Sequence, residues 1–175
     1  MKTLRCVRIA AGGPARGFNG VVYISAKVDY ATRVLLVLAA ADDRSMRGEA
    51  LALAQNLPVR FVENTLVELR RAGLVTSQRG ADGGYRLARP ASAIAVADVI
   101  RALEGPLAEV HGLRPDQRTY DGAAEHLQDV WVALRAAMRG VLEQVTLDRV
   151  LSGDLPPAVA TLVADPDAWE PRPLR

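Results

Sequence analysis

The chain has 175 residues, enough for one compact domain with an accessory helix. Half of its residues are apolar and 24% are charged, which is typical of a globular protein. Its longest apolar run, residues 34–41, is much shorter than the ~18 residues of a membrane helix, and Arg8 interrupts any secretion signal. The single cysteine, Cys6, excludes a disulfide framework within the chain. We therefore expect a cytoplasmic protein without a membrane segment.

The net charge of +2 comes from the start of the chain. Residues 1–20 hold four basic residues and no acidic one, whereas the rest holds 18 basic against 20 acidic residues. The charge of the whole chain is therefore no argument for nucleic-acid binding, and only local clustering can be.

Residues 1–22 read as a flexible basic arm, because glycines and Pro14 interrupt them. Two interpretations stay open. The arm inserts into a DNA minor groove, or the native protein starts at Val22 and the preceding residues are not part of it.

Helical patterns follow, joined by short turns. Ser25 is a good N-cap for a helix that extends to about residue 41. A short helix spans about residues 48–55, with Ala50, Leu51 and Ala54 expected inside. A tight turn leads to a third helix over about 59–72, which buries Val62, Thr65, Leu66 and Leu69 at helical spacing.

A hairpin comes next, with strands near residues 74–79 and 85–88 around a glycine-rich turn. A helix over about 96–103 then closes a domain of residues 23–105. Residues 106–119 are predicted to be loop, and 147–175 a tail with at most one short helix.

The longest helical pattern covers about residues 120–146. Its large apolar residues are spaced 4, 3, 4, 3 and 4 apart, a heptad seam of the kind that pairs two helices. The seam residues are Leu127, Trp131, Leu134, Met138, Val141 and Val145. We expect a homodimer held by this helix.

Three helices followed by a glycine-tipped hairpin predict a winged helix-turn-helix fold, mostly α in the α+β class. The third helix would present Arg60, Glu63, Asn64 and Thr65 to the bases of the major groove. In the wing, Arg79 and Arg86 with Gly80 and Gly83 would approach DNA. Ser25 and Lys27 complete the predicted interface, whose partner is double-stranded DNA.

The region of the third helix and wing carries the local basic cluster. Residues 58–90 hold six arginines against three acidic residues. An alternative stays open, in which the winged helix is a protein-interaction module and these arginines are solvated surface.

Four segments resemble the Rrf2 family of regulators, the IscR, NsrR and CymR group. They are residues 24–31 (ISAKVDYA), 69–75 (LRRAGLV), 79–88 (RGADGGYRLA) and 97–106 (ADVIRALEGP). The resemblance implies a cytoplasmic homodimer that binds a palindromic operator, usually as a repressor. It also implies that residues 59–72 are the recognition helix and 79–85 the wing.

The chain departs from many members of that family in the loop after Pro106. Those members hold an iron–sulfur cluster through three cysteines there, and residues 107–121 have none. Glu109, His111 and Asp116 match no metal motif that we recognise. The chain therefore resembles the cluster-free branch, with no cofactor and no metal, whose effectors or partner proteins vary.

No catalytic motif is present, neither a nucleophile elbow nor a phosphate loop nor a zinc-binding helix. We expect a transcriptional regulator that is not an enzyme.

Overall fold

The computed structural model describes residues 24–80 and 83–171. The predicted arm of residues 1–22 and part of the wing tip lie outside them. The described chain is mostly helical with one two-stranded antiparallel hairpin, as the sequence predicts. No helix in these two ranges is long and apolar enough to cross a membrane.

Three helices form the first half of the winged helix. They are α1 (Ala26–Ala40), α2 (Gly48–Gln55) and α3 (Val59–Arg71). Ser25 is the N-cap of α1 and accepts a hydrogen bond from the Val28 amide at 3.2 Å. Asn56 ends α2 with a left-handed backbone, which allows α3 to start after a very short turn.

The hairpin pairs β1 (Val75–Gln78) with β2 (Gly84–Leu87). The backbone of Met46 lies beside β2, and Met46 and Tyr85 exchange two hydrogen bonds of 2.9 and 2.8 Å. Gly84 permits this approach, because a Cβ there would lie 2.6 Å from the Met46 carbonyl. A short 3-10 turn, η1 (Ala91–Ala93), then leads to α4 (Val96–Glu104).

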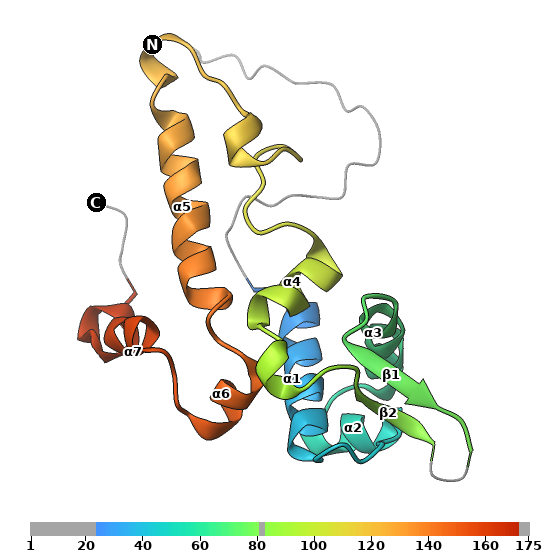
Figure 1. Ribbon diagram of the computed structural model, residues 1–175. Coiled ribbons are helices and arrows are strands. Elements are labelled where there is room, and N and C mark those ends of the chain that lie inside the picture. Colours follow the sequence, from blue (N-terminus) through green and yellow to red (C-terminus); the bar gives the residue numbers. More distant parts are fainter. Residues whose placement is uncertain (1–23, 81–82, 172–175) are drawn as a thin grey trace, which may run out of the picture.

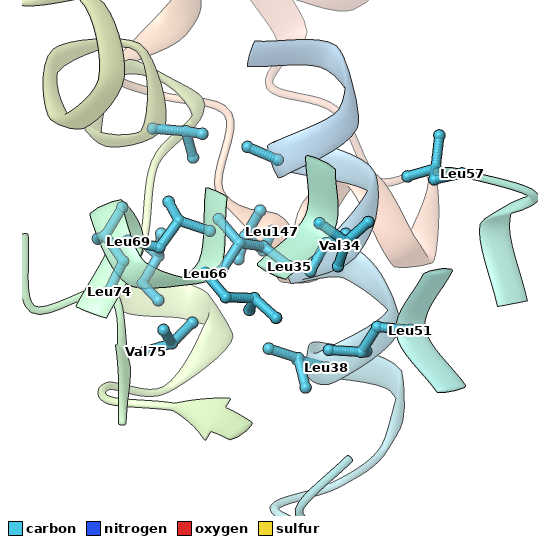
Figure 2. Packing of buried hydrophobic residues seen from close by; sticks show 14 of the residues in the cluster. Val34, Leu35, Leu38, Leu51, Leu57, Leu66, Leu69, Leu74, Val75 and Leu147 are labelled. Atoms are coloured by element: carbon cyan, nitrogen blue, oxygen red, sulfur yellow. The ribbon is translucent and has the colours of Figure 1, made fainter. Parts of the chain in front are cut away.

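The core lies between α1, α2, α3 and the hairpin (Figure 2). Leu35, Leu51, Leu66 and Leu69 are fully buried in it. The predicted inner face of α3 is confirmed in full, but that of α2 is wrong in part. Ala50 and Ala54 are exposed and Ala52 is buried, because alanines mark a helix face weakly.

The second half starts with two 3-10 turns, η2 (Pro115–Gln117) and η3 (Gly122–Ala124). They lead to α5 (Leu127–Leu142), which stands away from the winged helix (Figure 1). The helix is shorter at both ends than the predicted residues 120–146.

Two α-helices follow, α6 (Leu147–Ser152) and α7 (Pro157–Ala164), before a last 3-10 turn, η4 (Pro166–Ala168). The expectation of at most one short helix after residue 146 is therefore wrong. Helix α6 packs against α1, and Leu147 is fully buried in the core of the winged helix. The winged helix thus needs residues from well beyond position 105.

Val145 is not part of α5, which corrects its assignment to the predicted heptad seam. It follows the end of α5, is 8% exposed, and its carbonyl accepts a hydrogen bond from the Val96 amide at 2.9 Å. The neighbouring Thr146 bridges Ala95. The chain leaves the helical path here to bring α6 back to α1.

Candidate nucleic-acid interface

The outer face of α3 carries three of the four predicted reading residues. Arg60, Glu63 and Asn64 are exposed on its first two turns. Pro58 caps the helix without a side-chain bond, and the first turn holds no acidic residue. The amide end of α3 therefore keeps its positive potential beside Arg60, which favours a phosphate or a base edge.

Thr65 does not belong to this face, which corrects the prediction. It is 3% exposed, and its hydroxyl donates to the Phe61 carbonyl at 2.9 Å. A hydroxyl bonded within its own helix and buried against the core cannot reach a base.

Glu63 leans toward the start of α2. A Cβ built on Gly48 would lie 3.4 Å from the Glu63 Cγ atom. Helices α2 and α3 therefore come close together at Glu63, the residue predicted to accept a hydrogen bond from cytosine.

Lys27 has a structural partner instead of a free charge. Its ammonium donates to Glu68 of α3 at 2.6 Å and to the Leu103 carbonyl of α4 at 3.4 Å. Lys27 therefore links α1 to α3 and α4. Ser25, just before α1, already uses its side chain as the N-cap of this helix. Both residues can still face a phosphate, but their first role is in the fold.

The hairpin separates the predicted wing residues. Arg79 and Gly80 lie after β1 at the exposed tip, and the Gly83 amide donates to the Gly80 carbonyl at 3.0 Å. A Cβ on Gly83 would lie 2.7 Å from the Gln78 carbonyl, so glycine is required there by the turn itself.

Arg86 lies within β2 and not at this tip. Side chains alternate across a strand, and Tyr85 and Leu87 pack on the core, so Arg86 lies on the opposite face of β2. There it lines an open groove of about 700 Å³ together with Asp42, Asp43 and Arg89. The structure therefore groups Arg86 with two carboxylates and not with Arg60.

Positive charge remains unpaired on the α3 and wing surface. Among the described residues, no hydrogen bond or ion pair joins Arg60, Arg71 or Arg79 to another side chain. Glu68, an acidic residue in the second half of α3, is neutralised by Lys27. This local excess is the electrostatic pattern of a phosphate-binding surface.

Arg33 is a residue that the sequence analysis missed. Its guanidinium donates to the Gln55 carbonyl and to the Gln55 side chain, and it stacks on Tyr30 at 5.6 Å. Tyr30 meets Phe61 edge to face at 5.1 Å. Arg33 therefore fixes the turn between α2 and α3. Arg33 and Gln55 are 22 positions apart, so no local sequence motif indicates their contact.

The residues of the loop after α4 do not fit an iron–sulfur cluster. The chain has one cysteine, and four ligands, mostly thiolates, are usual. No group of three His, Cys, Asp or Glu side chains lies together within 24–80 and 83–171. Asp116 is instead bound by Arg135 at 2.5 Å and by Arg114 at 3.1 Å.

Comparison with known proteins agrees with the winged helix-turn-helix described above. A family model described as "Rrf2: Iron-dependent Transcriptional regulator" matches residues 24–153. A protein of Mycobacterium tuberculosis (strain H37Rv) named as an HTH-type transcriptional regulator, Rv1287, is 46% identical over 148 residues. That alignment covers 84% of this chain and 92% of the relative.

Solved structures show the same fold. CymR of Bacillus subtilis, titled as its global cysteine regulator, aligns with a TM-score of 0.65 at 32% identity. The alignment covers 76% of this chain and 98% of CymR. IscR of T. potens aligns with a TM-score of 0.62 at 31% identity, over 79% of this chain and 91% of IscR.

The match over most of the chain, the winged helix and the named relatives agree with one another. Family and relatives are transcriptional regulators of the helix-turn-helix type and not enzymes. The chain belongs to the Rrf2 family of DNA-binding transcriptional regulators.

Proposed function

We propose that the protein is a repressor that binds a palindromic operator as a homodimer. The observation that carries the proposal is the exposed first half of α3, with Arg60, Glu63 and Asn64, together with the exposed Arg79 of the wing. These side chains can pair with guanine, cytosine and adenine in the major groove. Arg79 can enter the minor groove beside it.

The exposure of apolar residues on α5 supports the dimer. None of its sixteen residues is buried, although most of them are apolar. Leu127, Trp131, Leu134, Met138 and Val141 share one face and are half-buried. A second α5 against this face would relate two recognition helices by a two-fold axis, which a palindromic site mirrors.

Repression needs no chemistry beyond occupancy of the operator. The relatives are named as regulators, and a dimer on its site blocks other proteins from the same DNA. We place this action in the cytoplasm, with the genome.

Selection of bound sequences from random DNA tests the proposal, followed by a gel shift with competitor DNA. We expect two inverted half-sites with centres about 10 base pairs, or a multiple of one helical turn, apart. If no sequence is enriched and modest competitor DNA abolishes the shift, the protein-interaction module is the correct interpretation.

A further inference from the structure

The last part of the described chain exposes large apolar side chains. We call residues 156–169, which comprise α7 and η4, the C-terminal hook. Leu162 is 56% exposed, Val163 44% and Trp169 73%, while Val159 is buried. The Trp169 indole donates to the Val163 carbonyl at 2.9 Å, so the ring is fixed against the end of α7. A fixed, exposed apolar surface of this kind marks a contact site.

The hook is held apart from the rest of its own chain. Leu147 anchors α6 in the core, and the Gly153 amide donates to the Arg149 carbonyl at 2.9 Å. The Asp154 amide donates to the Ser152 hydroxyl at 3.2 Å. Helix α7 packs on η4, on the side of the molecule away from the wing (Figure 1). This ordered connection leaves the apolar side chains of the hook uncovered.

Helix α5 has a second uncovered apolar strip beside the heptad seam. Val130, Ala133, Ala137 and Gly140 follow at spacings of 3, 4 and 3, so they share one face. All four are exposed, and Val130 is 56% exposed. A Cβ on Gly140 would meet nothing within 4 Å. The apolar arc of α5 is thus wider than pairing with one other helix requires.

The size of the seam also calls for a further contact. A 16-residue helix is about 24 Å long, so a band ~10 Å wide along it has an area of roughly 240 Å². A stable interface buries about 800 Å² on each partner. The α5 pair alone therefore falls short, and the hook and the strip are the uncovered apolar surfaces next to it.

We propose that the hook of one protomer packs on the small-residue strip of α5 in its partner. The inference rests on the dimer of the proposed function. Small residues let α7 and Trp169 approach the α5 backbone closely, and exchange between copies covers both apolar surfaces at once. The family model ends at residue 153, so the hook lies beyond the part matched to it.

Fluorescence of Trp169 in the full-length chain gives the first test. The variant Trp131→Phe leaves Trp169 as the single tryptophan. We expect acrylamide to quench it several-fold less in the dimer than in the same chain carrying Leu134→Asp. Equal quenching in both would overturn the proposal. Sedimentation and the gel shift, run on the same samples, report separately on the dimer and on DNA binding.

Disulfide trapping distinguishes the partner's strip from the chain's own. In a Cys6→Ser background, Val130→Cys is combined with Leu162→Cys and mildly oxidised. We expect a covalent dimer on a non-reducing gel, because the hook crosses to the other copy. The control combines Leu162→Cys with Val132→Cys, which lies on the other face of α5, and this pair should stay unlinked. A bond within one chain, or no bond in a sample that sediments as a dimer, would overturn the hook and leave the proposed function intact.

Discussion

Arg79 is a predicted interface residue that the fold does not use. It is exposed before Gly80, and no hydrogen bond or ion pair joins it to another side chain in the described ranges. Its guanidinium is therefore available to the negative potential of a narrow groove.

Replacing Arg79 with alanine should leave the free energy of unfolding within ~0.5 kcal/mol of the wild type. Operator binding should weaken by ~1–3 kcal/mol, and the slope of affinity against salt should fall by about one. Anisotropy titrations over a salt series measure both. Arg139→Ala, an exposed arginine on α5, is the matched control and should bind normally. Unchanged binding by the Arg79 variant would mean that the wing does not read DNA.

Gly84 is required by the close approach of two backbones. The variant Gly84→Ala places its Cβ 2.6 Å from the Met46 carbonyl, so the paired segments must separate. We expect a loss of ~1–3 kcal/mol in the free energy of unfolding, measured by urea denaturation.

The variant Gly73→Ala is the control that shows how much stability is lost through backbone strain alone, without a steric clash. Gly73 has a φ of +71° but open space around its Cβ position, so the loss there should be about 1 kcal/mol and smaller than the loss in Gly84→Ala. If the two variants lose equal stability, the Met46 contact is not what demands glycine at position 84.

Among the elements, the loop before α5 is tied to that helix by charge. Asp116 of η2 pairs with Arg135 at 2.5 Å, and Gln128 donates to the Asp116 carbonyl at 3.3 Å. The hydrogen bond from Arg135 holds the pKa of Asp116 below its ordinary value, and Arg114 adds to this effect. The loop therefore depends on an ionised carboxylate.

Lowering the pH should release this loop. Because the folded-state pKa is lowered, the contribution of Asp116 is present above the ordinary pKa of 3.8 and is lost as the pH falls through the lower folded value. Asp116→Asn should imitate this at neutral pH, with faster amide hydrogen exchange in residues 106–119. Asp121→Asn, at another exposed carboxylate, is the control. Unchanged exchange in the Asp116 variant would contradict the role of the ion pair.

At the scale of the whole molecule, the proposed dimer depends on α5. Leu134 lies at the middle of its half-buried face. Leu134→Asp would bury an unpaired charge between two helices, so the dimer dissociation constant should rise at least ~100-fold, or ~3 kcal/mol.

Sedimentation at micromolar concentration measures the effect of the Leu134 variant. Val132→Asp, on the other face of the same helix, should leave the dimer intact. A wild type that sediments as a monomer would disprove the dimer itself.

The chain should also be colourless when purified without oxygen. The loop after α4 has no thiolate, and its Asp116 is occupied by arginines. Visible absorbance with stoichiometric iron and sulfide would show that other ligands hold a cluster. Absorption spectra and iron analysis of the full chain decide this.

Much of the winged helix follows from the sequence alone, because its signals are local. The Ser25 cap, the apolar spacing in α3 and the glycines of the wing each act within a few residues. The same signals identify the exposed residues Arg60, Glu63 and Asn64. The family resemblance in the wing rests on those local motifs as well.

Only the tertiary structure decides which predicted residues are committed to the fold. The Thr65 side chain is of a type that can bind a base, but its position in α3 places it on the buried face. Lys27 forms an ion pair with Glu68, which lies 41 positions later in the sequence. Val145 continues the heptad pattern, yet the return of Leu147 to α1 removes it from α5. Contacts between distant segments depend on how whole helices pack, and periodicity within one segment carries no information about its partner.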